Sequence, residues 1–274
     1  GGGSQADNLA IRGFMDGPSS KGRKHIITSK IEHHAVLYTC EALEKEGYRV
    51  TYLNVDKEGR VDLEQLKAEL SEDTALVSVM AANNEIGTIQ PIKQIAELAH
   101  SVGAKFHTDA VQAVGHMHID VQEMGIDMLS LSGHKFRGPR GTGVLYVKKG
   151  ITLEPLVYGG GQERGIRAGT EATPQIAAFG VAAEIGSAKM AEAVKTMAEL
   201  RTHAIDRLTA EGGGVTVIGG GAPPILSISL PGYRSEVLMN FLEARSIYTS
   251  KSSACKKGGR SHVLEAIGLP SNVI

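Results

Sequence analysis

The chain has few cysteines, almost no net charge and no long apolar run, and each shortage argues against a class of protein. Cys40 and Cys255 are its two cysteines in 274 residues, too few for a disulfide framework. With 29 basic against 30 acidic residues, the formal net charge is -1, so no basic field favours nucleic acid. No basic-then-apolar leader and no membrane-length run is present. We therefore expect a cytoplasmic, globular protein, and a hydrophobic content of 42% suffices for a buried core.

The two ends of the sequence suggest a piece of a longer protein. There is no initiator Met, the chain opens on Gly1-Gly2-Gly3-Ser4, and it closes at Ile274 just after a helical pattern. We therefore expect a truncated chain.

The first two thirds alternate short β-branched runs with amphipathic stretches. This alternation is typical of βαβ units and predicts an α/β fold with a mainly parallel sheet and helices on both faces. The predicted strands are 25–28, 49–53, 75–80, 104–108, 128–131 and 143–147, and the predicted helices are 35–46, 63–70 and 92–102, the last punctuated by Pro91 and Gly103.

From Thr173 the pattern changes to a long alanine-rich helix that should reach Leu208. A strand at 225–230, a helix at 235–244 and a helical pattern at 262–267 are expected to follow. We predict a large domain at 1–175 and a smaller, incomplete α+β domain at 176–274 that carries a loop with Cys255.

Lys135 ends the run Ser132-Gly133-His134-Lys135, directly after a predicted buried strand. In sheets of this kind ligands bind at the carboxyl ends of the strands. A lysine held there and kept partly unprotonated can act as an amine nucleophile toward an aldehyde cofactor. A solvated loop lysine is the alternative, and these residues alone leave both open.

Asp109 follows another predicted strand, with Gln112 three residues later. A carboxylate opposite a pyridinium nitrogen keeps the ring protonated, which is the usual device of pyridoxal enzymes. As a lone feature, however, an Asp after a strand is more often a helix cap. Gln112 alone indicates nothing.

The glycine-rich opening runs into a helical pattern, and Ser4 is predicted to cap that helix with Asp7 as the capping-box acid. Glycine-rich backbone before a helix N-terminus can also hold a phosphate. An ordinary capped helix and an expression linker of composition GGGS are the alternatives. No GxxxxGK[ST] pattern occurs, so no nucleotide P-loop is predicted.

Two more strand ends carry polar side chains. His33 offers an imidazole that could stack on a cofactor and move protons near neutral pH. Asn84 could donate to a phenolic oxygen, although an Asn in a turn is the simpler alternative. His116 and His118 complete no zinc spacing, so no metal is predicted.

Cys255 lies in a strongly basic loop that includes Lys256, Lys257 and Arg260. Adjacent cations favour thiolate over thiol, which makes this cysteine a candidate nucleophile. Cys40 falls inside a helical pattern and is predicted to be a core residue.

Taken together in order and spacing, these motifs resemble the cysteine desulfurases, a branch of the class V aminotransferases with the type I pyridoxal-phosphate fold. The resemblance spans essentially the whole chain. Its motifs are Ser29-Lys30-Ile31-Glu32-His33, Asn83-Asn84-Glu85-Ile86-Gly87, His107-Thr108-Asp109-Ala110 with Gln112, Ser132-Gly133-His134-Lys135, the run 159–165 with Arg167 and Gly169-Thr170, and Ser253-Ala254-Cys255.

Carried over by position, the resemblance implies a cofactor, pyridoxal 5'-phosphate, and a set of roles. Lys135 would hold the cofactor as a Schiff base, Asp109 would pair with its ring nitrogen, and Cys255 would accept sulfur. His33 would stack on the ring and take part in proton transfer. The phenolic oxygen would be contacted by Gln112 and Asn84, the phosphate by Ser4, Ser132 and His134, and the phosphate of a neighbouring subunit by Thr170.

The implied reaction converts L-cysteine to L-alanine and leaves a persulfide on Cys255. That sulfur would pass to an acceptor protein, an iron-sulfur scaffold or a tRNA-thiolation carrier. The resemblance also implies a homodimer, and neither nucleic acid nor membrane is an expected partner.

The sequence departs from the family pattern in three places. Gln5 replaces an acid after Ser4, and the loop after Cys255 is shorter and more basic than in many relatives. Members of the family also have an N-terminal segment before Gly1 and an arginine beyond Ile274 that clamps the substrate carboxylate. Without that clamp cysteine would be poorly positioned, so we expect this chain to bind cofactor but to turn over slowly.

Three candidate functions besides a desulfurase stay open at this point. A selenocysteine lyase differs only in substrate, and another class V aminotransferase or lyase would not need the thiol. A truncated, non-catalytic member of the family could instead serve as a binding module.

Overall fold

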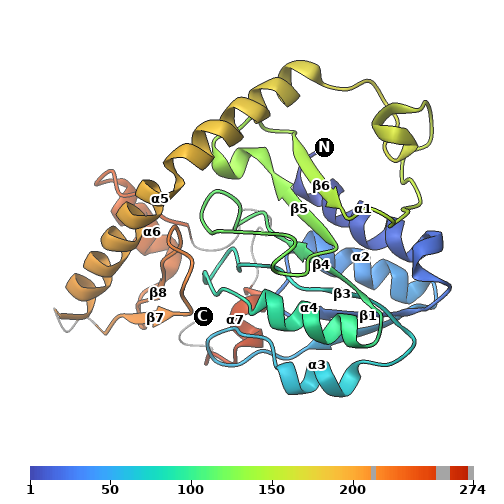
Figure 1. The fold of residues 1–274 in the computed structure, drawn as a ribbon. Helices are drawn as coiled ribbons and strands as arrows, with labels where there is room; N and C mark the ends of the chain where they lie inside the picture. Colours follow the sequence, from blue (N-terminus) through green and yellow to red (C-terminus); the bar gives the residue numbers. More distant parts are fainter. Residues whose placement is uncertain (211–213, 251–259, 271–274) are drawn as a thin grey trace.

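A six-stranded sheet forms the centre of the molecule in the computed structural model, which describes residues 1–210, 214–250 and 260–270 (Figure 1). The strand order is β2-β1-β3-β4-β5-β6, and all neighbours are parallel except β5 and β6. The predicted α/β fold with a mainly parallel sheet is therefore confirmed. The strands are β1 (His25–Ser29), β2 (Arg49–Leu53), β3 (Thr74–Ser78), β4 (Lys105–Asp109), β5 (Met128–Ser132) and β6 (Gly143–Val147).

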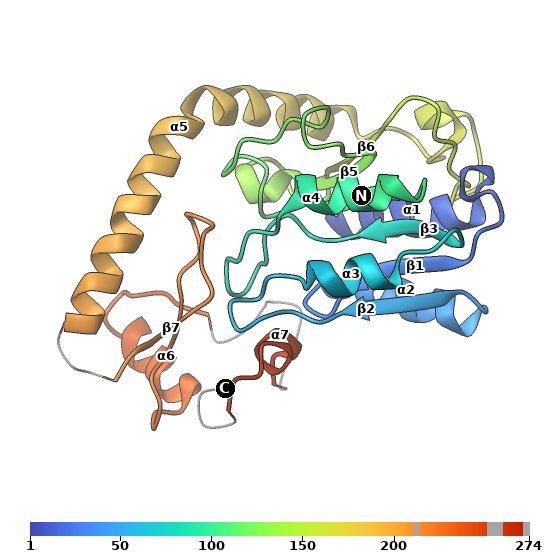
Figure 2. The same ribbon diagram turned by 60° about the horizontal axis from the view of Figure 1, so that its bottom comes forward.

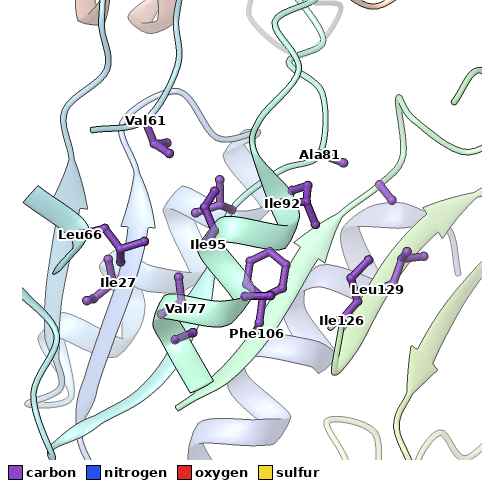
Figure 3. Close-up of a cluster of buried hydrophobic side chains, with 14 of the residues drawn as sticks. Ile27, Val61, Leu66, Val77, Ala81, Ile92, Ile95, Phe106, Ile126 and Leu129 are labelled. Carbon is purple, nitrogen blue, oxygen red and sulfur yellow. The ribbon is translucent and has the colours of Figure 1, made fainter. Parts of the chain in front are cut away.

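Helices cover both faces of this sheet, because successive side chains of a strand point to opposite sides. Ile26 and Leu76 pack with α1 and α2 on one face, while Ile27 and Val77 pack with α3 and α4 on the other, in the cluster drawn in Figure 3. β1 and β3 are buried at all five positions, as expected of parallel strands covered on both sides. The helices are α1 (Gly3–Asp16), α2 (His34–Lys45), α3 (Leu63–Glu69) and α4 (Ile92–Ser101).

The sequence pattern of α4 accounts for its position. Ile92, Ile95 and Ala99 recur at helical spacing and are buried against the sheet. Pro91 is the N-cap, and Gly103, just past the end, takes a φ of 71° that a glycine adopts without steric cost. The predicted helix with its two punctuating residues is confirmed.

The predicted cap at Ser4 is wrong. α1 begins at Gly3, its N-cap is Gly2 with a φ of 82°, and no side chain caps it. The helix therefore starts two residues earlier than a Ser4 cap requires. Ser4 lies exposed in the first turn, and Asp7 is buried beneath the helix instead of closing a capping box.

The described part of the chain from Thr173 onward consists of a long helix, a two-stranded sheet and two short helices. α5 (Thr173–Ala210) runs away from the sheet as one long helix (Figures 1 and 2), as predicted, and leads to a two-stranded antiparallel sheet. Of the strand predicted at 225–230, only Ser227–Ser229 forms a strand, the second of this small sheet. The first strand, Thr216–Ile218, lies between two glycine clusters and was not predicted. The remaining elements of the described residues are β7 (Thr216–Ile218), β8 (Ser227–Ser229), α6 (Ser235–Glu243) and α7 (His262–Ala266). The 3-10 turns found there are η1 (Pro18–Ser20), η2 (Gly133–Phe136) and η3 (Gln162–Gly165).

No helix within the described ranges has both the length and the apolar character to span a membrane.

Candidate active site

A cavity of about 1200 Å³ lies at the carboxyl ends of the sheet strands. In α/β sheets this edge is where ligands bind. Residues of β7, β8 and α6 line its opposite side, among them Ile218, Ile228 and Leu238. The cavity brings together eight of the nine residues predicted to bind cofactor: Ser4, His33, Asn84, Asp109, Gln112, Ser132, His134 and Lys135.

Lys135 lies on η2, which follows β5 without a break. The next residue, Phe136, packs edge-on against Phe179 of α5 with 5.1 Å between ring centroids. Gly133 leaves no room for a side chain, since a Cβ there would come within 2.8 Å of both Phe179 and Thr142. The short turn that carries the lysine is therefore packed between Phe179 and Thr142.

Asp109 is the last residue of β4 and is 5% exposed. Its Oδ1 accepts a hydrogen bond from the Val111 N–H at 2.9 Å, as in an Asx turn. Turns and no helix follow at residues 111–116, so Asp109 is not the helix cap that the sequence left open. Burial raises the pKa of Asp109 to about 6, against the Val111 N–H and the positive charge of Lys135, which lower it. Asp109 is thus a buried carboxyl that is mostly ionised at neutral pH and interacts with the cavity lysine.

The start of α1 lies against the end of β5 and the start of β6. A Cβ on Gly3 would come within 2.8 Å of a valine side chain, and a Cβ on Gly143 within 2.6 Å of the Gly2 backbone, so these segments approach as only glycines permit. The Ser132 hydroxyl and His134 Nδ1 are 2.9 Å apart in the same cavity. N–H groups at a helix start, with hydroxyl and imidazole donors beside them, suit a phosphate.

His33 is the N-cap of α2, and its Nδ1 accepts a hydrogen bond from the Ala35 N–H at 3.1 Å. Burial lowers the pKa of His33, and the charges of His34, Lys135 and His262 lower it further. At neutral pH the ring is therefore uncharged and carries its proton on Nε2, since Nδ1 is an acceptor. A neutral imidazole that lines the cavity can move a proton on and off Nε2.

Two predicted residues are not part of this cavity as described. Thr170 is exposed and is not among the lining residues. Cys255 lies outside the described residues. The helix that follows it, α7, is attached beside the cavity: the Ser261 hydroxyl donates to the Glu85 carboxylate, and His262 Nε2 lies 3.0 Å from the Glu32 carbonyl oxygen.

Sequence reasoning assigned no site role to two buried carboxyls close to the cavity. Glu32 is fully buried, accepts hydrogen bonds from the Ser29 hydroxyl and the Met80 N–H, and burial raises its pKa to about 8. Asp7 is 1% exposed and lines the cavity. The available signal was helical spacing, because Asp7 shares the buried face of its helix with Ala10, Ile11 and Phe14.

Comparison with known proteins gives consistent matches. Residues 1–267 match the family described as Aminotransferase class-V. The chain is 47% identical to the Cysteine desulfurase IscS of Methanosarcina thermophila over 100% of this chain and 68% of that protein, and 48% identical to the Cysteine desulfurase IscS of Clostridium botulinum over 98% and 69%. Among solved structures, a NifS-like protein superposes with a TM-score of 0.91 at 37% identity, over 99% of this chain and 73% of that one. The structure described as SspA in complex with cysteine superposes with a TM-score of 0.83 at 35% identity, over 99% and 77%.

Proposed function

This chain belongs to the aminotransferase class-V family, in its cysteine desulfurase branch, and from that premise we propose that it converts L-cysteine to L-alanine with pyridoxal 5'-phosphate as cofactor. The observation that carries the proposal is the content of one cavity: a lysine at a strand end, a buried carboxylate and a glycine-rich helix start. Those three features match the aldehyde, the ring nitrogen and the phosphate of the cofactor.

When bound, the cofactor supplies an electron sink that stabilises negative charge on a substrate carbon. The residues of the chain supply the positioning. Lys135 is the amine for covalent attachment, Asp109 in its ionised form keeps the ring nitrogen protonated, and His33 covers the ring and moves a proton at Nε2. Gln112 and Asn84 are the proposed contacts of the phenolic oxygen, and Ser4, Ser132 and His134 those of the phosphate.

Cys255 is the proposed acceptor of the substrate sulfur, as a persulfide. Lys256 and Lys257 beside it favour its thiolate form. Cys40 is unsuited to this role, because it is fully buried in the core and burial raises the pKa of its thiol to about 12. The sulfur would then leave to an acceptor protein, an iron-sulfur scaffold or a tRNA-thiolation carrier.

The remaining parts of the proposal concern assembly. We propose a cytoplasmic homodimer in which Thr170 reaches the phosphate of the other subunit, and a division of each chain into domains at 1–175 and 176–274. Exposed apolar side chains along α5, including Ile185 and Leu200, support a subunit contact on this side of the molecule.

The test is a pair of cysteine variants. Cys255→Ala should keep the visible absorbance of the bound cofactor and lose at least about 100-fold in sulfide release from L-cysteine, since the sulfur has lost its nucleophile. Cys40→Ala is the matched control and should keep both the absorbance and sulfide release. Undiminished sulfide release by Cys255→Ala would instead favour a lyase that does not need the thiol.

Two further measurements distinguish a desulfurase from a selenocysteine lyase and from a non-catalytic module. Competition between L-cysteine and L-selenocysteine shows which of the two amino acids is the preferred substrate. If the chain takes up no pyridoxal phosphate and develops no borohydride-sensitive visible band, it is a non-catalytic module and the proposal is wrong.

A further inference from the structure

Asp7 combines deep burial with one carboxyl oxygen that has no hydrogen-bond partner in the part of the chain that the structure describes. It is 1% exposed, it lines the cavity from α1, and its Oδ1 has no hydrogen-bond partner among the described residues. An ionised carboxylate in such a place is costly, because a hydrogen bond from Ser130 replaces only part of the hydration that burial removes. Uptake of a proton removes most of that cost.

His107 is the nearest candidate for a counter-ion, since its Nε2 lies 3.9 Å from Asp7 Oδ1. Both of its ring nitrogens are already engaged, Nδ1 with the Ser78 hydroxyl at 2.8 Å and Nε2 with the Ser130 hydroxyl at 2.9 Å. The ring is fully buried, and burial lowers its pKa to about 3. His107 is therefore neutral at physiological pH, and the 3.9 Å contact is not an ion pair.

The other titratable groups that face Asp7 are acids, Asp109 at the end of β4 and Glu32 in the β1–α2 connection. Burial raises the pKa of Asp7 well above its usual value, and the charges of Asp109 and Glu32 raise it further, while the Ser130 side chain lowers it. Asp109 differs because the Val111 N–H and Lys135 both favour its charged form. Of the two neighbouring carboxyls, Asp109 therefore ionises first.

We propose that Asp7 is a positioning residue of the cofactor site that stays un-ionised, so that the single negative charge of the Asp7–Asp109 pair rests on Asp109. The proposal depends on the proposed function in one respect, namely that the group to be held is the ring nitrogen of the cofactor. A second anion on α1 would offer that nitrogen a competing partner. A neutral Asp7 lines the same cavity as Asp109 without adding a second negative charge to it.

The protonation of Asp7 is tested on the cofactor-free chain by thermal unfolding of Asp7→Asn between pH 4 and pH 8. A carboxyl whose folded pKa is raised contributes stability that is fully present below its unfolded value, near 3.8, and is lost as the pH rises toward the folded value. The asparagine needs no proton. The variant and the parent should melt together near pH 4, and the variant should melt roughly 5 °C higher at pH 8.

The matched control is Asp206→Asn on the exposed surface of α5, which should show no pH-dependent difference. A lower melting temperature of Asp7→Asn at pH 8 would mean that an ionised Asp7 stabilises the fold. A difference that is the same at every pH would mean a packing effect alone. Either result overturns the proposal.

The location of the charge is tested by the affinity for pyridoxal phosphate as a function of pH. Asp109→Asn should bind the cofactor at least about tenfold more weakly at pH 7.5, because the ring nitrogen has lost its anionic partner. In the parent, affinity should fall as the pH drops through about 6, partly because Asp109 takes up a proton and partly because the cofactor phosphate does. Asp109→Asn should lack the first part of this fall, whereas Asp7→Asn should keep the whole profile of the parent. If Asp7→Asn instead behaves like Asp109→Asn, the charge is shared and the assignment is wrong. If no form of the chain binds the cofactor, the proposed function fails, and the melting curves still decide the protonation of Asp7.

Discussion

The two halves of the molecule bury their side chains to very different extents. In the sheet half, residues 1–147, β1 and β3 are buried at every position and two apolar clusters lie on opposite faces. In the other half the 38 residues of α5 include no buried one, and Ile185 and Leu200 on it are 52% and 63% exposed. Figure 1 shows the contrast as a layered body with a long helix running away from it.

The difference matches what each half has to supply. Side chains that must hold a ligand within a fraction of an ångström need supports that do not move, and all eight predicted contacts in the cavity come from the sheet half. The other half closes one side of the cavity, adds a few buried residues such as Ala222 and Val263 to the core, and exposes most of the surface of α5. In our proposal that surface meets a second subunit and a sulfur acceptor.

The largest expected effect comes from removing the lysine of the sheet half. Lys135→Ala deletes the proposed attachment amine, so cysteine turnover should fall by at least about 100-fold. The visible band of the cofactor should shift, since Lys135 is the one lysine among the described residues that line the cavity. Absorbance and alanine formation measure the two effects.

Lys189→Ala, on the exposed surface of α5, is the control for that change. It removes the same charge and the same side chain from the other half and should leave both readouts unaltered. If Lys135→Ala and Lys189→Ala lose alanine formation equally, the catalytic groups are not confined to the sheet half.

A smaller effect is expected on stability from two phenylalanines. Phe106 is fully buried at the centre of the cluster in Figure 3, so Phe106→Ala should lower the free energy of unfolding by about 3–5 kcal/mol. Phe241 in α6 is 53% exposed and lies against Arg245, with 3.6 Å from the guanidinium carbon to the ring centroid. Phe241→Ala should cost about 1 kcal/mol or less, mainly the lost cation–π contact. Urea unfolding curves of the two variants provide the measurement, and similar losses would contradict the contrast.

Sequence patterns predicted the sheet half well because its strands and helices obey simple periodicities. Ile92, Ile95 and Ala99 define a buried helical face, and the short apolar runs place Asp109 and Ser132 at strand ends. Since the carboxyl ends of parallel strands meet at one edge, their side chains had to converge. The roles assigned to them and the domain boundary at 175 stay predictions.

The sequence was less informative wherever tertiary packing decides. Asp7 has the sequence signature of a capping acid, yet Gly2 starts the helix early and the carboxyl is buried, and that burial and the charge of Asp109 raise its pKa. The short strand β7 lies between glycines and, among the described strands, pairs with β8 alone, so no periodicity reveals it. Buried polar groups depend on the partners that surround them in three dimensions, which a linear pattern does not list.

The smallest expected effects concern two acidic residues, one from each half. Asp127 is fully buried, and its Oδ2 accepts hydrogen bonds from His100 Nε2 at 2.6 Å and from the Phe106 N–H at 3.0 Å. Asp127→Asn should lower the free energy of unfolding at pH 7 by about 1–3 kcal/mol, because charge-assisted hydrogen bonds are lost. Glu199 in α5 is 65% exposed and lies 3.9 Å from Lys195, so Glu199→Gln should cost less than about 0.5 kcal/mol.

The pH dependence of this pair tests the cause. Burial pushes the pKa of Asp127 upward, but the hydrogen bonds from His100 and Phe106 and the charges of His100 and Lys105 outweigh it and lower the pKa below its usual value. A carboxylate with a lowered folded pKa contributes stability that is present above the unfolded value, near 3.8, and is lost as the pH falls through the folded value. Unfolding curves of Asp127→Asn and the parent should therefore converge between pH 4 and pH 2, while the small difference for Glu199→Gln should vanish in high salt at pH 7. If Asp127→Asn lowers the free energy of unfolding by the same amount at pH 2 as at pH 7, the loss comes from packing. Electrostatic interactions would then not explain why the change costs more in the sheet half than in α5.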